Sequence, residues 1–325
     1  MKEVQFIKNN SERWREVELF LSKKTSFKDP DKLAELFIQL TDDLSYSKTF
    51  YPQSKTTQYL NSLTSKVHQS VYKNKKEKRS RFITFWKYEL PEIFFLRRQE
   101  VLISFIIFFA AVVIGVVSSA GDTGFVRLIL GDSYVNMTLE NIDQGDALAV
   151  YKQMNGVDMF MGITFNNIRV SFYAFISGLL LSVGTIMLLL YNGIMLGTFH
   201  HFFFERNLLF EALSIIWIHG TIEISSIIIA GAAGLILGNS ILFPKTYSRR
   251  QSFLMAAKDG VKIIIGLIPL FIIAGFLESF VTRYTKMPIF FNLIIIISSL
   301  SFIIWYVIIY PFKLSRRAKN ESKEN

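Results

Sequence analysis

The stretch VLISFIIFFAAVVIGVVSSA, residues 101–120, decides the fold class of this 325-residue chain. It carries no charged residue, and about 20 apolar residues suffice to cross the hydrocarbon layer of a membrane. Because that layer holds no water to bond the backbone, such a segment has to be a helix. At least four further apolar runs follow it, whereas the first 100 residues contain none. The sequence therefore predicts an all-α protein, with a helical head followed by a polytopic transmembrane helix bundle.

The apolar runs predict six embedded segments, and five is the alternative count. The expected segments are residues 101–120, 168–191, 193–204, 208–238, 263–280 and 289–310. The third of them has only twelve residues, so we expect it to cross as a short helix or to re-enter the membrane. Asn192, Gly193 and Gly197 lie at its start and favour a break there, which is typical of a discontinuous helix.

Charge asymmetry predicts which side of the membrane each loop faces. Basic residues precede the first span, whereas residues 121–167 form a polar loop with six acids and two bases. Basic loops tend to stay in the cytoplasm. We therefore expect the loop 121–167 to lie outside the cytoplasm and both termini to lie inside it. The first residues contain no apolar core, so no cleavable signal peptide is expected.

The composition divides the chain into four parts. Residues 1–72 are expected to form a cytoplasmic helical head, 73–99 a basic linker and interfacial amphipathic helix, 100–312 the bundle, and 313–325 a basic tail. Twenty of the 36 Lys and Arg residues lie in the first 100 positions, which favours attraction to anionic lipid over nucleic-acid binding. In the interfacial helix aromatic residues alternate with bases. The residues expected at the lipid surface are Arg81, Trp86, Lys87, Arg97 and Arg98.

Ionisable residues inside the apolar runs are the candidate site, because a charge within a membrane is costly. His219 and Glu223 lie four residues apart, which places them on one face of a helix. Such a pair can relay protons, bind a cation, form a socket for another chain or lock two helices together. The structural lock is the favoured interpretation. Glu278 is a further candidate, although its place at the end of a segment also fits the outer interface.

No catalytic residue, metal ligand set or cofactor is predicted. The chain has no cysteine, which excludes thiol catalysis and Cys-ligated metals. A zincin motif requires a second histidine where Glu223 stands, and the adjacent His200 and His201 point to different faces of a helix. Small residues with a four-residue repeat follow the polar pair and predict close helix packing. They are Ala230, Gly231, Gly234 and Gly238.

Several motifs together resemble the stage II sporulation protein M family. They are, in chain order, RW (13–14), DLSYSKTFYP (43–52), QYLNSLTSKVHQSVY (58–72), PEIFFLRR (91–98), NGIMLG (192–197), HGTIEI (219–224), GAAGLILG (231–238) and LESF (277–280). The resemblance implies a multi-pass protein of the bacterial inner membrane. The family's namesake anchors peptidoglycan-degrading proteins during spore engulfment. Relatives in bacteria that form no spores often neighbour a MoxR-type ATPase and an RDD membrane protein, so the resemblance implies a scaffold more than it implies sporulation.

Two functions of different classes are compatible with these features. The first is a non-enzymatic scaffold that recruits cell-envelope proteins through the head, the outer loop or a groove of the bundle. The alternative is a small transporter or lipid-handling protein that uses His219 and Glu223 in a broken-helix cavity. The expected partners are membrane lipids and envelope proteins, with the MoxR-type ATPase and the RDD protein as candidates implied by the resemblance. No nucleic acid is expected, and a homo-oligomer is also compatible with the sequence.

Overall fold

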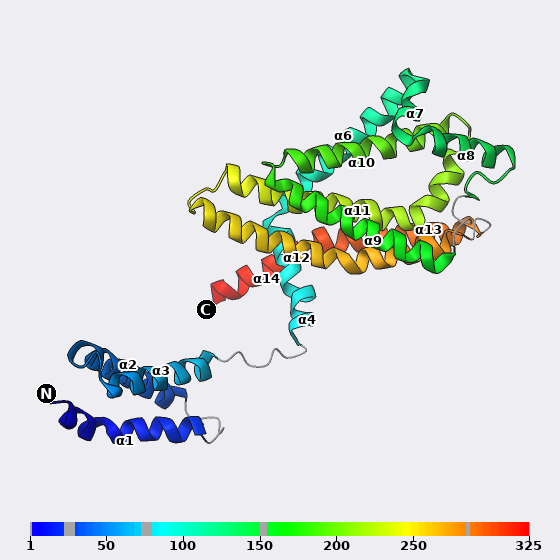
Figure 1. The fold of residues 1–325 in the computed structure, drawn as a ribbon. Helices are drawn as coiled ribbons and strands as arrows, with labels where there is room; N and C mark the ends of the chain where they lie inside the picture. The colour runs from blue at the N-terminus through cyan, green and yellow to red at the C-terminus, as the bar shows by residue number, and fades with distance from the viewer. Residues whose placement is uncertain (1, 23–29, 73–79, 150–154, 284–286, 325) are drawn as a thin grey trace. The chain divides into compact units, whose positions relative to one another are not determined.

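The computed structural model describes residues 2–22, 30–72, 80–149, 155–283 and 287–324, and these are helical throughout apart from short turns (Figure 1). The chain forms two compact units, residues 1–81 and 82–325. The apolar runs lie in the second unit, as the sequence predicts. The basic run at 73–79 lies outside the described residues.

The first unit is a three-helix head. Its helices are α1 (Glu3–Ser22), α2 (Pro30–Phe50) and α3 (Lys55–Tyr72). Their apolar stripes meet in one core, formed by Phe6, Trp14, Val17, Leu36, Leu40, Leu44, Leu60, Leu63 and Val67. One buried polar group joins α1 to α2, because the Asp43 carboxylate accepts hydrogen bonds from Arg13 (3.1 Å) and from Trp14 Nε1 (2.9 Å). The head therefore has its own core and its own polar anchor.

The second unit begins with three short helical segments and continues with long ones. The short segments are α4 (Ser80–Thr84), the π-helical turn η1 (Phe85–Glu89) and α5 (Leu90–Leu96). The remainder is α6 (Arg98–Gly121), α7 (Thr123–Leu130), α8 (Asp132–Asp143), α9 (Gly156–Ile176), η3 (Ser177–Leu179), α10 (Val183–Phe204), α11 (Leu209–Leu242), α12 (Arg249–Phe276), η4 (Leu277–Val281), α13 (Ile289–Ile304), η5 (Trp305–Ile309) and α14 (Tyr310–Glu324).

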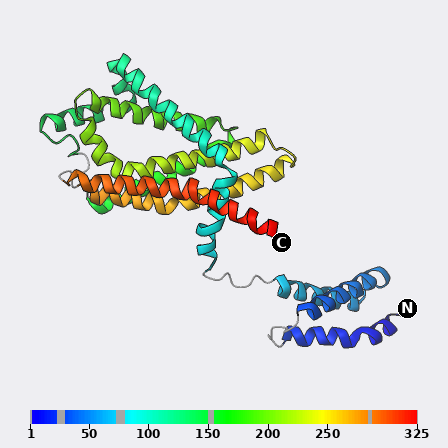
Figure 2. The same ribbon diagram turned by 180° about the vertical axis from the view of Figure 1, so that it is seen from behind.

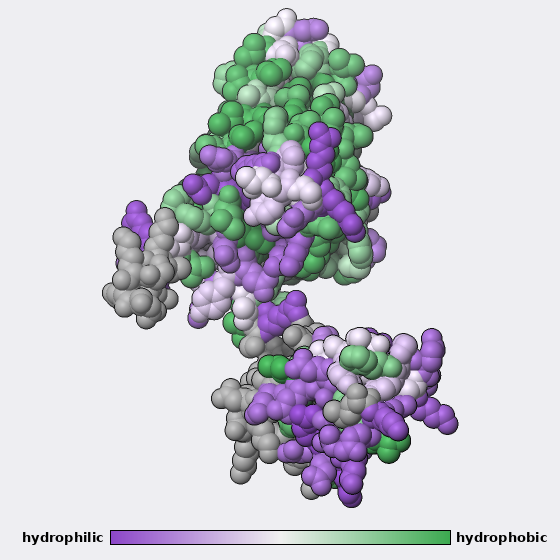
Figure 3. All heavy atoms as spheres, turned by 90° about the vertical axis from the view of Figure 1, so that its left-hand side faces the viewer, coloured by the Kyte–Doolittle hydropathy of each residue, from purple (hydrophilic) through white to green (hydrophobic). Residues whose placement is uncertain are grey.

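Five helices of the described residues are long and apolar enough to cross a membrane. They are Arg98–Gly121, Val183–Phe204, Leu209–Leu242, Arg249–Val281 and Ile289–Arg317. Figure 3 looks at the end of this unit where α11 and α12 meet, and it shows hydrophilic side chains in the middle with apolar side chains around and above them. Many apolar side chains along these helices are exposed, among them Phe105, Ile265 and Ile297, as expected for contact with lipid tails. The chain is therefore a multi-pass membrane protein.

The boundaries that the sequence predicts for the segments 168–191 and 193–204 are wrong. The chain ends α9 at Ile176 and reverses direction at Leu181 and Ser182, whose φ angles are 54° and 69°. The run 193–204 is then the second half of the full-length helix α10, with no break at Asn192 or Gly193. The sequence pattern does not predict this reversal, because the turn contains three leucines and the hydropathy stays high through it.

Helix α9 lies beside the apolar helices although it is more polar than they are. It has 21 residues, packs against α11 and α12, and carries Asp158, Asn166, Asn167 and Arg169. Figure 1 shows it running alongside α11 and α12, whereas in the view from behind α12 and α13 lie in front of it (Figure 2). Five crossings would place the two ends of the chain on opposite sides of a membrane, whereas counting α9 as a sixth would place them on the same side.

The predicted polar loop 121–167 is largely helical. Its first part forms α7 and α8, and its last part is the start of α9. Asp122 caps α7 by accepting a hydrogen bond from the Gly124 amide (2.8 Å), and Gly131 separates α7 from α8 with a φ of 84°. A left-handed residue at a helix end favours glycine. Residues 150–154 lie outside the described part.

Impermeant thiol labelling of intact cells tests the topology, because the chain has no cysteine of its own. We expect label on a Ser133→Cys protein and none on Thr246→Cys or Asn320→Cys, since the acidic segment is predicted to lie outside and the basic ones inside. All three positions are exposed. Permeabilised cells provide the control, in which all three variants should react. Label on Asn320→Cys but not on Thr246→Cys in intact cells would contradict six crossings.

Candidate functional site

His219 lies on the buried face of α11 and is held by a short chain of hydrogen bonds. Its Nδ1 is 3.1 Å from the Thr282 hydroxyl, and that hydroxyl donates to the Leu277 carbonyl at 3.1 Å. A hydroxyl has one hydrogen, so Thr282 must accept from Nδ1–H of the imidazole. In that tautomer the lone pair of the ring lies on Nε2. The ring is only 4% exposed.

Two carboxylates face the same place as Nε2. The Glu278 Oε1 atom lies 3.8 Å from His219 Nε2. Glu223 stands one turn further along α11, and one donor atom from each of the three residues lies within 4.8 Å of the others. Glu278 is therefore part of an intramembrane cluster, which we call the His–Glu–Glu cluster, although it stands about sixty residues further along the chain.

The end of α12 brings Glu278 to this position. The helix does not stop at Phe276 but continues as the π-helical turn η4, in which the Thr282 amide bonds the Leu277 carbonyl at 2.9 Å. Such turns occur frequently at functional sites because they turn side chains away from the regular helical face. Here one turn supplies both Glu278 and the hydroxyl of Thr282. Sequence reasoning missed this pairing because it depends on which helix lies beside α11.

The cluster brings two carboxyl groups together inside the apolar bundle. Neither Glu223 nor Glu278 forms an ion pair with a Lys or Arg among the residues that the structure describes. The Glu278 side chain is 15% exposed. Carboxylates in such a place are costly unless a proton or a cation compensates them.

A third helix contributes polar groups next to the cluster. The Asn167 side chain on α9 interacts with Glu223, yet its Nδ2 atom is buried without a hydrogen-bond partner at good geometry. The Ser279 hydroxyl on η4 is also buried without one.

The candidate residues of α10 lie elsewhere and have a packing role. A Cβ on Gly193 would meet the Ala111 side chain and the Phe108 carbonyl, and one on Gly197 would meet the Val112 carbonyl. These glycines let α10 approach α6 backbone to backbone. Asn192 donates to the carbonyl one turn earlier in its own helix, at 2.8 Å.

The small residues of α11 allow neighbouring helices to pack closely against it, as their spacing predicts. Ala230, Gly231, Gly234 and Gly238 are all buried. A Cβ on Gly234 would enter the hydrogen bond between Thr185 and the Ala174 carbonyl, which joins α10 to α9. Helix α11 is thus the central element on which the other helices pack.

The segment predicted to lie at the lipid surface is only partly exposed. Leu90, Ile93 and Phe94 of α5 are buried in the bundle core, which an interfacial helix would not require. Arg97 forms an ion pair with Asp259 of α12 at 2.7 Å. Arg98 remains exposed and lies over the Phe95 ring. Of the other residues expected at the lipid surface, Arg81 and Lys87 are exposed. Trp86 packs against the bundle core.

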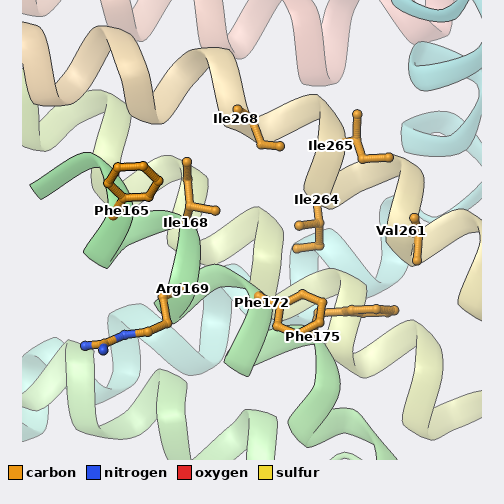
Figure 4. Close-up of a pocket in the computed structure, with 9 residues that line it drawn as sticks. All are labelled: Phe165, Ile168, Arg169, Phe172, Phe175, Val261, Ile264, Ile265 and Ile268. Atoms are coloured by element: carbon orange, nitrogen blue, oxygen red, sulfur yellow. The ribbon is translucent and has the colours of Figure 1, made fainter. Parts of the chain in front are cut away.

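An apolar groove runs between α9 and α12 on the outside of the bundle. It has a volume of about 530 Å³ and is lined by Phe165, Ile168, Arg169, Phe172, Phe175, Val261, Ile264, Ile265 and Ile268. Figure 4 shows the apolar side chains of the two helices facing each other, while the Arg169 guanidinium extends away from them. The groove is suited to an apolar occupant rather than to a polar ligand.

Comparison with models of known protein families identifies the family of this chain. The model for Stage II sporulation protein M matches residues 104–283, which is more than half of the chain. The chain belongs to this family. The match contains the whole His–Glu–Glu cluster and the α9–α12 groove. The head matches a separate model, a domain of unknown function, over residues 4–73. No curated protein and no solved structure matches the chain.

Proposed function

We propose that this member of the Stage II sporulation protein M family is a non-enzymatic scaffold of the bacterial inner membrane, with both termini in the cytoplasm. The close packing of its helices supports a static bundle. The glycines of α10 and α11 bring backbones into contact at several crossings, and such crossings resist the sliding that alternating access requires. A bundle of this kind holds its surfaces fixed, which suits a protein that positions others.

The α9–α12 groove is the surface that we propose for a partner within the membrane. It is apolar, and its exposed residues Val261 and Ile265 lie on a helix that belongs to the core of the bundle. An apolar transmembrane helix of a cell-envelope protein has the chemistry to fill it. The head offers a second, independently folded surface for cytoplasmic partners, among which a MoxR-type ATPase and an RDD membrane protein are the first candidates.

Photo-crosslinking in native membranes tests the scaffold. A photoreactive amino acid at Val261 in the groove is expected to yield a discrete crosslinked protein. The same amino acid at Ile297 of α13, which is also exposed, should yield only lipid adducts. The partner is then identified by mass spectrometry. Equal crosslinking at both positions, or none at Val261 and none at exposed positions of the head, would count against a scaffold.

The alternative function, a small transporter or lipid-handling protein, is favoured by one observation, the two carboxyl groups of the His–Glu–Glu cluster that have no Lys or Arg partner among the described residues. Glu223→Gln separates the two functions. If the protein is a scaffold, the Glu223→Gln variant should complement a deletion strain in proportion to the amount of folded variant in the membrane. For a transporter, complementation should disappear at normal abundance. Abundance and melting temperature in detergent, measured beside complementation, decide between them.

A further inference from the structure

We propose that His219, Glu223 and Glu278 bind one divalent transition-metal cation inside the membrane bundle. The inference concerns a site that the scaffold function does not require, and it holds for a structural or a transported ion alike. It rests on the tautomer of the histidine, on the separation of the donor atoms and on the charge of the cluster.

The hydrogen bonds of His219 prepare Nε2 as a metal ligand. Metal-bound histidines almost always donate their other N–H to a fixed acceptor, which sets the ring orientation and raises the basicity of the ligating nitrogen. Thr282 accepts that N–H here and is itself oriented by the Leu277 carbonyl. Nε2, which carries the lone pair in this tautomer, is also the ring nitrogen that lies 3.8 Å from Glu278 Oε1.

The donor atoms have the separation that a shared ion requires. His219 Nε2 and Glu278 Oε1 are 3.8 Å apart, which is too long for a hydrogen bond between them. Two ligands that each lie ~2.1 Å from one ion are separated by roughly 3.4 Å in tetrahedral geometry. The three donor atoms lie within 4.8 Å of one another, so a small rotation of the glutamate side chains closes them around an ion.

The charge of the cluster matches a divalent cation. Metal ligands bind in their deprotonated forms, in which a neutral imidazole and two carboxylates together carry two negative charges, and no Lys or Arg pairs with either carboxylate among the described residues. A bound ion of charge +2 neutralises them in a medium where isolated charges are costly. Asn167 lies beside Glu223 and can orient it, as Thr282 orients His219.

The donor types select the class of metal. An imidazole nitrogen with carboxylate oxygens suits Zn²⁺ and other first-row transition ions, whereas Mg²⁺ prefers oxygen ligands and keeps its waters. Three protein ligands also leave one position of a tetrahedral ion for water or for a further group. We therefore expect Zn²⁺ and Co²⁺ to bind and Mg²⁺ to compete poorly.

The same bundle contains a matched pair that should not bind an ion. His201 and Glu205 have the same four-residue spacing, with 3.8 Å between His201 Nδ1 and Glu205 Oε1. The Arg206 guanidinium lies 3.6 Å from Glu205 Oε2 and already compensates this carboxylate. The pair also has no second carboxylate from another helix within the described residues.

The test uses the full chain, purified in detergent, stripped with a chelator and titrated with Zn²⁺ against a chromogenic competitor. We expect one high-affinity Zn²⁺ per chain and, with Co²⁺, visible absorption bands of a tetrahedral site. The Glu223→Gln, Glu278→Gln double variant should bind Zn²⁺ at least about 100-fold more weakly, since loss of an orienting partner alone costs ~10–100-fold. The His201→Gln, Glu205→Gln double variant should retain the wild-type affinity.

Thr282 provides a second variant that leaves every ligand in place. Thr282→Val should weaken Zn²⁺ binding ~10–100-fold, and Thr282→Ser should retain it because the hydroxyl is kept. Circular dichroism and gel filtration confirm the folding of each protein, and Glu278→Gln alone replaces the double variant if that variant fails to fold. Absence of stoichiometric Zn²⁺ in the folded wild-type chain, or equal affinity in the cluster variant, would overturn the proposal.

Discussion

Replacing Gly234 with alanine is expected to destabilise the bundle strongly. The added Cβ would meet the Ala174 carbonyl and the Thr185 hydroxyl, which hydrogen-bond each other across α9 and α10. Extra atoms in a packed core cost about 1–3 kcal/mol when side chains can yield. Backbone atoms yield less, so we expect a cost at the upper end of this range, with a lower melting temperature in detergent and less protein in the membrane.

Gly220→Ala is the matched control on the same helix. A Cβ there has its nearest neighbours at 3.8 and 3.9 Å, which is ordinary contact distance. Alanine is preferred over glycine within a helix by about 1 kcal/mol, so this variant should be as stable as the wild type or more stable. Similar melting temperatures for Gly234→Ala and Gly220→Ala would contradict the close packing of α11 against α9 and α10.

The second large effect is expected in the head. Asp43→Ala removes the carboxylate that accepts from Arg13 and from the buried Trp14 Nε1. A buried donor left without its charged partner costs about 1.5–3 kcal/mol, and a domain as small as this head has little stability to lose. We expect faster cleavage of α1 and α2 by a protease added to the full-length protein in detergent, with unchanged cleavage of the bundle.

Asp42→Ala is the control for this experiment, because Asp42 is the exposed neighbour of Asp43 on the same helix. It removes the same charge from the head without touching the core. The head of this variant should resist protease like the wild type. Equal sensitivity of both variants would mean that net charge, rather than the hydrogen bonds to Trp14, stabilises the head.

The sequence predicts the membrane helices well where composition changes at their ends. Span 101–120 ends at the polar residues that follow it, and α6 ends at Gly121. The turn after α9 was missed because it is made of Ser, Gly and Leu, and its left-handed residues have no compositional signal. Hydropathy averages over such a turn, so the sequence pattern of these two helices predicts one span and a short remainder.

At the candidate site, too, the sequence predicts neighbours on one helix but not neighbours that tertiary packing brings together. His219 and Glu223 lie four residues apart on one helix, so the sequence alone predicts that they share a face. The addition of Glu278 and Thr282 depends on the packing of α11 against η4, some sixty residues away, which no periodicity of a single helix contains. The burial of α5 was missed for the same reason, since its partners α12 and α14 lie far along the chain.

The polarity of α9 has a consequence for how the protein is made. A translocon releases a helix into lipid when its transfer free energy is favourable, and Asp and Arg each oppose that release by about 2.5–3.5 kcal/mol at the centre of a span. Helix α9 carries Asp158 and Arg169, and it buries Thr164, Asn167 and Ser171 in a bundle whose helices α11 and α12 are synthesised after it. Its stable insertion therefore has to wait for α11 and α12, so that chains truncated before Leu209 should leave α9 exposed to quality-control proteases.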